Sequence, residues 1–271
     1  MQKGGLQVEI LLQATENRAD RTRLGVAAAL ACALAVLTAV AWPGAAESAP
    51  ARVVVLGKTT SPPPPSCPGK VVNNVEILPC RVEGHVTGYQ AKIEGEARPY
   101  EAPFDGKIVA WSITLAKPSR KETKTTTDEV GFFDEFLGRP SQARIGVLRP
   151  VEDSSPPQYT LVRQSPLEVL NPYFGSTPIF ALEHPLTVLR GQVVALTIPT
   201  WAPALAVGGG SDTAWRASRL PDKCGETPEQ ARVELPEGHP QQRPKSKKVY
   251  ACYYRGSRLL YTATLVKKPR Q

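Results

Sequence analysis

The sequence predicts an all-β fold, an antiparallel β-sandwich of the jelly-roll type, preceded by an apolar N-terminal helix. Three observations lead to this prediction. Segments that alternate apolar and polar residues recur along the chain from residue 71 onward, and turn residues separate them. No helical periodicity lies between these segments. Prolines are frequent, 27 among 271 residues, and prolines at irregular spacing interrupt helices.

The clearest predicted strand is formed by residues 107–116. One face of it carries Val109, Trp111, Ile113 and Leu115, and smaller or polar residues alternate with them. Similar segments are residues 71–77, 82–93, 143–149, 159–170, 179–183, 192–198, 248–254 and 258–266. We favour a jelly roll over an immunoglobulin-like sandwich because the units of strand plus loop are long and uneven.

The composition of two segments between these strands predicts their structure. Arg255-Gly256-Ser257 separates the last two segments and predicts a tight hairpin. Residues 117–129 contain no apolar side chain except Pro118, and they predict a solvated, mobile loop.

The N-terminal region has the charge pattern of an export segment. Arg18, Arg21 and Arg23 precede a stretch without any charge from Leu24 to Trp42. As a helix, this stretch is roughly 28 Å long, close to the thickness of a bilayer core. Because the basic residues come first, we expect the rest of the chain to lie outside the cytoplasm.

The fate of this segment has two interpretations. The small residues Gly44-Ala45-Ala46 and Ala49-Pro50-Ala51 suit a signal peptidase and predict a cleaved signal peptide. The apolar stretch exceeds the usual signal-peptide core, however, and this favours an uncleaved membrane anchor. Residues 1–51 are therefore predicted to be a cytoplasmic segment plus a signal peptide or membrane anchor, so that the protein is either secreted or held in the cell membrane.

The remaining chain is predicted to contain a linker and one domain. Four consecutive prolines between Ser61 and Ser66 favour a polyproline II spacer, so residues 52–69 are interpreted as a Pro-rich linker or, alternatively, as a stiff loop. Residues 70–271 are predicted to form a single β-sandwich domain with a basic C-terminal tail.

Four of the five cysteines follow the export segment, whereas Cys32 lies inside it. An even number of exported cysteines predicts disulfides, with three possible connectivities. Proximity in the sequence favours Cys67–Cys80 and Cys224–Cys252. A zinc site is the alternative, but there is no Cys-x-x-Cys pair and the three histidines are scattered. We therefore expect neither a metal nor a cofactor.

Four motifs together resemble a family of exported β-sandwich domains common in actinobacterial proteins. They are residues 103–106 followed by Trp111, residues 143–150, residues 159–162 and residues 189–196. The resemblance covers about residues 100–200. This chain departs from the family pattern at Gln192, where the family usually has aspartate. The family has no assigned activity, and the resemblance implies a binding or structural module.

The most site-like feature combines tryptophans, arginines and a glycine run. Gly208-Gly209-Gly210 lies between Trp201 and a segment that contains Trp215, Arg216 and Arg219. Indole faces can stack on sugar rings, and arginines pair with carboxylates or phosphates. The alternative is that both tryptophans fill the core and the arginine stems cover a sheet edge. Tyr173, in a second aromatic loop, is a further candidate binding residue.

The net charge of +8 has two interpretations, a basic surface that only serves solubility or one that meets an acidic partner. Export makes nucleic acid the least expected one, so a cell-envelope glycan, an anionic wall polymer or a protein partner is predicted. The basic clusters 243–248 and 267–270 suit anionic lipid or polymer. There is no Gly-x-Ser-x-Gly motif, and the three histidines are scattered along the chain. A non-enzymatic binding module is thus the main hypothesis, and a secreted, glycosidase-like hydrolase is the alternative.

Overall fold

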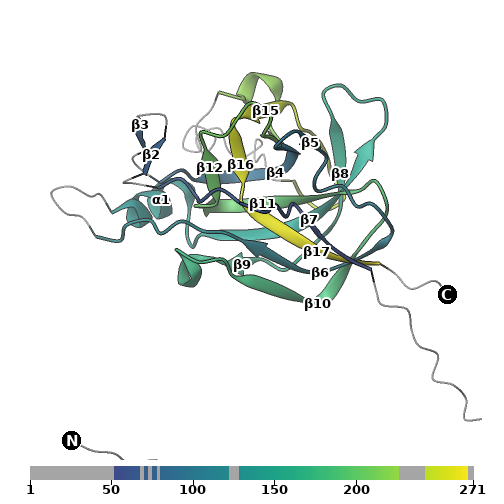
Figure 1. Cartoon of the computed structure of the whole chain (residues 1–271), viewed down its shortest axis with the longest axis horizontal. Coiled ribbons are helices and arrows are strands. Elements are labelled where there is room, and N and C mark those ends of the chain that lie inside the picture. The colour runs from purple at the N-terminus through teal and green to yellow at the C-terminus, as the bar shows by residue number, and fades with distance from the viewer. Residues whose placement is uncertain are drawn as a thin grey trace, which may run out of the picture. The chain divides into compact units, whose positions relative to one another are not determined.

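The computed structural model describes residues 52–67, 70–72, 75–77, 80–121, 128–225 and 242–267 (Figure 1). The predicted all-β class is confirmed, because these residues form mostly antiparallel sheets, one of them curled. The predicted export segment, residues 24–42, lies outside the described residues. Of the helices in the described ranges, none is long and apolar enough to cross a bilayer.

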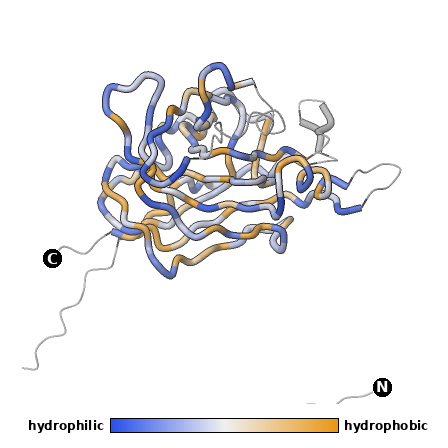
Figure 2. The backbone as a smooth tube through the Cα atoms, turned by 180° about the vertical axis from the view of Figure 1, so that it is seen from behind, coloured by the Kyte–Doolittle hydropathy of each residue, from blue (hydrophilic) through white to orange (hydrophobic). Residues whose placement is uncertain are grey.

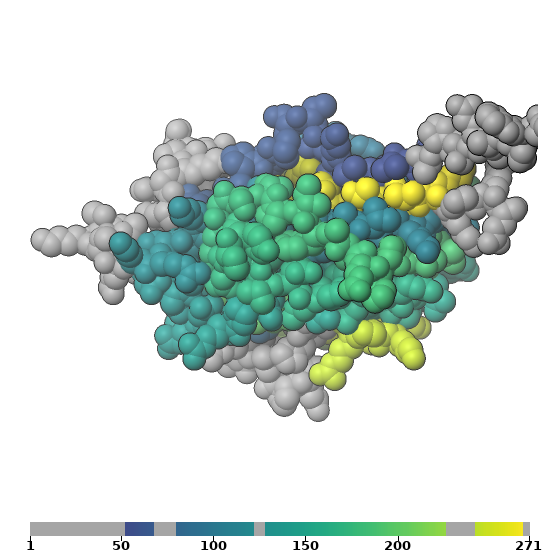
Figure 3. Space-filling model, turned by 90° about the horizontal axis from the view of Figure 1, so that it is seen from below, coloured from purple at the N-terminus to yellow at the C-terminus, as the bar shows by residue number. Residues whose placement is uncertain are grey.

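The first sheet has four strands in the order β1-β17-β6-β10. They are β1 (Val53–Leu56), β17 (Tyr261–Lys267), β6 (Gly106–Ile113) and β10 (Ile179–Val188). Figure 3 shows them side by side, in purple, yellow, blue and green. Its two edge strands, β1 and β10, are at least 123 residues apart in the chain, and β17 and β6 lie between them, so the sheet depends on long-range pairing.

The second sheet has nine strands, and seven of them follow the order β14-β8-β7-β11-β4-β13-β15. These seven are β14 (Lys247–Val249), β8 (Gln158–Gln164), β7 (Gln142–Val151), β11 (Val193–Ala202), β4 (Glu83–Ile93), β13 (Ala214–Ala217) and β15 (Cys252–Arg255). Two short strands complete the sheet, with β5 (Glu96–Ala97) beside β4 and β9 (Glu168–Val169) beside β7. Two small sheets pair β12 (Leu205–Val207) with β16 (Ser257–Leu259), and β2 (Lys70–Val72) with β3 (Val75–Ile77).

One large hydrophobic core contains side chains from both main sheets. Trp111 and Leu265 come from the four-stranded sheet, and Val147 and Leu196 come from the nine-stranded one. Apolar segments therefore run through the middle of the body (Figure 2). Burial of this apolar surface is the main favourable contribution to folding, at about 25 cal/mol per Å².

The alternation in residues 107–116 predicts the strand correctly, but it places Val109 on the buried face, where the structure has Ile108. Trp111 and Ile113 are buried as expected, but Ile108 is fully buried in place of Val109, which is only half-buried. The reason is a bulge opposite Leu265, where the pairing with β17 skips Val109. A bulge adds one residue to one strand and reverses the alternation beyond it.

Arg255-Gly256-Ser257, predicted to be a hairpin turn, connects β15 of the nine-stranded sheet to β16 of a small two-stranded sheet. Gly256 has a φ of 67°, which suits a tight turn. The flanking strands do not pair with each other, because β15 pairs with β13 and β16 pairs with β12. The turn residues were therefore interpreted correctly and the strand pairing was not.

A helix, α1 (Glu129–Leu137), begins at the end of the predicted loop 117–129, of which residues 122–127 lie outside the described part. Asp128 caps the helix by accepting a hydrogen bond from the backbone nitrogen of Gly131, at 2.9 Å. Val130, Phe133 and Leu137 form its buried face, at the spacing that a helix requires. Residue 129 thus belongs to an ordered element rather than to a solvated loop.

Glu129 joins three separate segments through its buried carboxylate. Oε1 accepts a hydrogen bond from the backbone nitrogen of Cys80 at 2.7 Å, and Oε2 accepts one from Ser119 at 2.8 Å. Only 4% of the residue is exposed. Hydrogen bonds to a charged acceptor are stronger than those between neutral groups, so this carboxylate holds α1 against both segments.

We expect Glu129→Gln to lower the free energy of unfolding by about 1–2 kcal/mol. The carboxylate has two acceptor oxygens and the glutamine amide has only one, so one of the two backbone N–H groups loses its acceptor. Urea unfolding followed by tryptophan fluorescence measures the change. The matched control is Glu135→Gln on the exposed side of the same helix, for which about 0.5 kcal/mol or less is expected. Equal effects of the two substitutions would contradict a structural role for Glu129.

Residues 52–67 belong to the body and are not a separate linker. Residues 53–56 form β1, and Ser66, at the end of the proline run, is bonded to β12. Ser66 is fully buried; its backbone nitrogen donates to the Leu205 oxygen at 3.0 Å and its Oγ accepts from the Val207 nitrogen at 3.0 Å. A run bound in this way does not act as a free spacer, so the predicted boundary at residue 70 lies too late in the chain.

Both predicted disulfides are present. Cys67 is bonded to Cys80, and Cys224 is bonded to Cys252. The first bond lies beside α1, since Cys80 belongs to a small second core that includes Phe133. The second closes a longer loop, with a sequence separation of 28 instead of 13.

Candidate binding site

The two tryptophans of the predicted site are core residues. Trp201 is 0% exposed and Trp215 is 1% exposed, so neither offers an indole face to a sugar ring. Trp201 packs against Phe133, with ring centroids 5.1 Å apart, and its Nε1 donates to Asp134 Oδ1 at 3.0 Å. Trp215 belongs to the other core, and its Nε1 donates to Ser257 Oγ at 3.1 Å. The alternative interpretation of the sequence, core packing, fits both positions.

The two arginines have structural contacts. Nη1 of Arg216 donates to the backbone oxygen of Tyr250 at 3.1 Å, and its guanidinium lies 4.8 Å from the centroid of the Tyr253 ring. Arg219 is buried, where it pairs with Glu83 at 3.6 Å and donates to the Tyr254 hydroxyl at 2.9 Å. These contacts join β13 and the chain after it to neighbouring strands.

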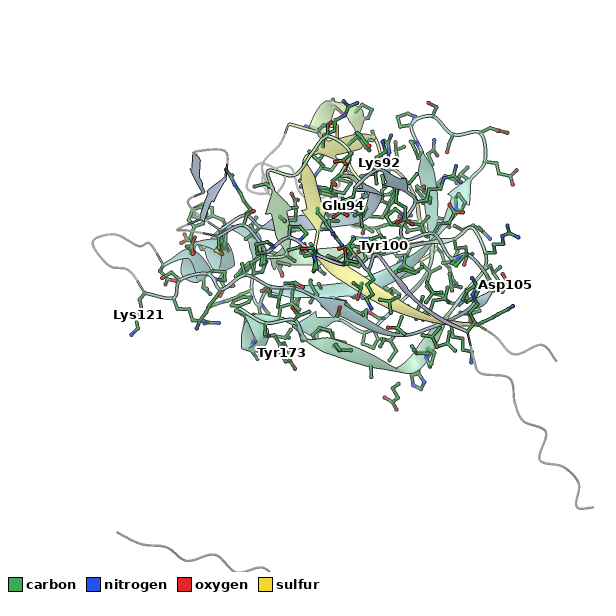
Figure 4. All side chains as sticks on the ribbon, in the orientation of Figure 1. Lys92, Glu94, Tyr100, Asp105, Lys121 and Tyr173 are labelled. Carbon is green, nitrogen blue, oxygen red and sulfur yellow. A yellow bond between two sulfur atoms is a disulfide. The ribbon has the colours of Figure 1, made fainter. Side chains whose placement is uncertain are left out.

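Tyr173 lies apart from these residues, in a short 3₁₀ turn (Asn171–Tyr173), and a second such turn is Pro221–Lys223. The Tyr173 ring is 40% exposed and lies edge-on to Phe180, at a centroid distance of 5.4 Å. In Figure 4 it lies on the lower surface, away from the centre of the body. The structure therefore does not bring the five predicted site residues together.

The glycine run does line a hollow of about 380 Å³, which we call the glycine hollow. Glu94, Asp212 and Arg258 also line it. The run is held in place at Gly209, whose nitrogen donates to the Gly256 oxygen at 2.9 Å. Neither Trp201 nor Trp215 lines this hollow.

A larger hollow of about 540 Å³ lies where β4, β8 and the turn before β6 meet, and we call it the tyrosine hollow. Its size is within the range of small-molecule sites. The residues that carry its chemistry are Tyr89, Tyr159, Tyr100, Pro157, Arg98 and Glu101. Tyrosine rings and a proline thus form its walls, and one cation and one carboxylate lie among its polar groups.

The walls are held by a cluster of three tyrosines. The Tyr159 hydroxyl donates to the Tyr89 hydroxyl at 3.0 Å, and the two ring centroids are 5.2 Å apart. Tyr250, fully buried, lies behind both rings and donates from its hydroxyl to Gln242 Oε1 at 2.7 Å. Gln242 Nε2 in turn donates to the backbone oxygen of Tyr159 at 2.7 Å. The network fixes the rings in place before any ligand arrives.

The phenol groups of Tyr89 and Tyr100 are neutral at physiological pH. Burial, followed by the charge and hydrogen bond of the Tyr159 phenol, raises the pKa of Tyr89 well above its usual range. Burial likewise raises the pKa of Tyr100, whose hydroxyl donates to the backbone oxygen of Tyr261. Tyr89 and Tyr100 are therefore uncharged phenols, which suit hydrogen-bonding and apolar contacts rather than nucleophilic attack.

Arg98 and Glu101 form an exposed ion pair at the hollow. Arg98 Nη1 lies 3.5 Å from Glu101 Oε2, and the Arg98 side chain is 76% exposed. Such a pair contributes little to stability, so both side chains are available to a ligand. Arg98 also has a φ of 57°, in the left-handed region that favours glycine. The chain thus holds an arginine where glycine is energetically easier.

The tyrosine hollow is not recognisable from the sequence, for a physical reason. Tyr89 and Tyr159 lie in segments whose strand pattern was recognised, but they are 70 residues apart and nothing local relates them. The only local signal is the short stretch from Arg98 to Glu101, where two charges flank a proline and a tyrosine.

The described residues contain no group of three or more histidine, cysteine or acidic side chains that suits a metal ion. The tyrosine hollow instead offers apolar walls, phenol hydroxyls, one guanidinium and one carboxylate, a set that suits binding.

No protein-family model, no curated protein and no solved structure matches the chain.

Proposed function

We propose that this protein is a non-enzymatic, extracytoplasmic module that binds a saccharide of the cell envelope in the tyrosine hollow. The observation that carries the proposal is the combination of fixed tyrosine rings with the exposed Arg98–Glu101 pair around about 540 Å³. Aromatic rings pack against the C–H faces of sugars, and the half-buried ring of Tyr159 is open to such contact, whereas Tyr89 and Tyr100 are 6% and 0% exposed and support the wall from within. Guanidinium and carboxylate groups pair with the hydroxyl and acidic groups of sugars.

The compartment is supported by two features. The basic-then-apolar N-terminal pattern is that of exported proteins, and two disulfides are consistent with an oxidising compartment. In this proposal, residues 24–42 anchor the protein in the cell membrane or are removed on secretion. The proposed architecture is a jelly-roll-like sandwich, of the kind that the resemblance to exported actinobacterial domains implies.

Arg98→Gly tests the binding proposal without weakening the fold. Glycine adopts the positive φ of residue 98 without strain, so we expect the free energy of unfolding to stay the same or to rise by up to about 1 kcal/mol. Binding of the purified chain to isolated envelope polysaccharide should weaken by about tenfold or more, as expected when a charged contact worth roughly 1.4 kcal/mol is lost. Isothermal titration calorimetry measures this change.

The matched control is Lys245→Gly, which removes an exposed cation from another position of positive φ, 64°. Binding should be unchanged in this variant. Equal weakening by both substitutions would show that overall positive charge, and not the hollow, attracts the polysaccharide. Unchanged binding by Arg98→Gly would overturn the assignment of the hollow.

A hydrolase is the second candidate, and the glycine hollow favours it, because two carboxylates, Glu94 and Asp212, line the same space. Glycosidases use such a pair as acid and base or nucleophile. The test is release of reducing sugar from envelope polysaccharide by the wild-type chain and by Glu94→Gln. Release that depends on Glu94 would favour this candidate over the binding module.

A further inference from the structure

One end of the four-stranded sheet holds the points where both terminal segments leave the described body. The backbone nitrogen of Lys267, the last residue of β17, donates to the Arg52 oxygen at 2.9 Å. Lys267 also pairs with Gly106, the first residue of β6, and Gly106 pairs with Val188 at the end of β10. This end is marked by Asp105 in Figure 4, far from Lys121.

Four cations lie at this end: Arg52, Lys107, Arg190 and Lys267. Three of them are exposed and Lys267 is half-buried, and among the described residues none forms an ion pair. The loop before β6 holds two carboxylates: Asp105 accepts a hydrogen bond from the backbone nitrogen of Arg190 at 2.7 Å, and Glu101 pairs with Arg98. Beside Arg190, Leu189 is an apolar side chain that is 51% exposed.

The sequence before Arg52 limits how far this end can lie from a membrane. Trp42, the last residue of the apolar stretch, precedes Arg52 by ten residues. A fully extended chain of that length reaches at most about 35 Å. If residues 24–42 anchor the protein, the attachment keeps Arg52, at this end of the sheet, within that distance of the lipid surface.

We propose that this basic end binds the anionic lipid headgroups of the membrane in which residues 24–42 are anchored. The inference rests on the anchor interpretation within the proposed function. Charge complementarity supports it, because the four cations outnumber the two carboxylates of the neighbouring loop, of which Asp105 accepts a backbone hydrogen bond and Glu101 pairs with Arg98. Leu189 provides an apolar side chain for the interface itself, and the tether removes most of the entropic cost of association.

The test uses the full chain in nanodiscs of phosphatidylcholine alone or with one-third phosphatidylglycerol. An uncharged acylating reagent labels accessible lysines, and mass spectrometry quantifies each site. On the anionic nanodiscs, labelling of Lys107 and Lys267 should fall by at least about fivefold. One contact of a basic residue with anionic lipid, worth about 1 kcal/mol, already gives this factor. Lys121, at the opposite end, should be labelled equally on both. Protection should disappear at 1 M salt, where the Debye length is about 3 Å.

The double variant Arg52→Gln, Arg190→Gln keeps both reporter lysines and should restore most of their labelling on anionic nanodiscs. Its matched control, Lys117→Gln with Arg120→Gln, removes two exposed cations near Lys121 and should leave Lys107 protected. Equal labelling of Lys107 on the two kinds of nanodisc would overturn the proposal.

Two further outcomes identify where a failure lies. Loss of the full chain from both kinds of nanodisc after an alkaline wash would overturn the anchor and this inference with it, while leaving the tyrosine hollow untouched. Protection of Lys107 by soluble poly(glycerol phosphate) on neutral nanodiscs, without protection by phosphatidylglycerol, would overturn the membrane assignment in favour of a wall polymer.

Discussion

Trp201→Ala should lower the free energy of unfolding by about 3–5 kcal/mol, the usual cost of truncating a large buried aromatic residue. The indole is completely buried and packs between Phe133 of α1 and Phe174, with centroids 5.1 and 5.4 Å away. Its removal leaves a cavity and deprives Asp134 of the donor that the indole supplied at 3.0 Å. Urea unfolding followed by circular dichroism measures the loss.

Two companion variants separate core packing from ligand binding. Trp201→Phe refills much of the cavity and should retain wild-type affinity for envelope polysaccharide. Tyr173→Ala removes a ring that is 40% exposed, so a loss of only about 1 kcal/mol or less is expected. Weaker binding by Trp201→Phe at unchanged stability would restore Trp201 as a binding residue and contradict its core role.

The second large effect concerns the Cys224–Cys252 disulfide. Replacing both cysteines with alanine should cost roughly 3.6 kcal/mol, because a bond that closes 28 residues restricts the unfolded chain by that amount on the chain-entropy model. Removing Cys67–Cys80, which closes 13 residues, should cost less, roughly 2.9 kcal/mol. Denaturant midpoints under non-reducing conditions give both values.

Reduction supplies the internal control for this prediction. A thiol reductant should lower the midpoint of the wild-type chain by more than that of Cys224→Ala, Cys252→Ala, because only one disulfide is left to break in the variant. A double variant with the wild-type midpoint would contradict the contribution assigned to this bond. Peptide mapping of the unreduced chain checks the pairing itself.

The strands were predictable because their signal is local. Residues 107–116 alternate visibly in the sequence, and β6 (Gly106–Ile113) covers most of them; the predicted segments 82–93 and 179–183 likewise overlap β4 (Glu83–Ile93) and β10 (Ile179–Val188). Alternation shows which face of a strand is apolar but not which strand pairs with it. The bulge at Val109 and the turn at Gly256 both depend on partner strands, and there the expectations failed.

Helix α1 shows a different kind of miss. Asp128 at its start, apolar residues at Val130, Phe133 and Leu137, and Gly138 after its end are readable helix signals. They occupy only nine residues beside a long polar stretch, and short helices owe their stability to packing rather than to local propensity. That packing, against Trp201 and the first disulfide, exists only in the folded chain.

The sequence by itself determined the all-β class, most of the strands and both disulfide pairs, because these depend on local alternation and on cysteines close in the chain. Only the tertiary structure decided that Trp201 and Trp215 lie in the core and that residues 52–67 belong to the body. It alone brings Tyr89 and Tyr159 together beside Arg98 and Glu101. Burial and the meeting of distant side chains depend on how sheets pack, and no periodicity along one strand contains that information.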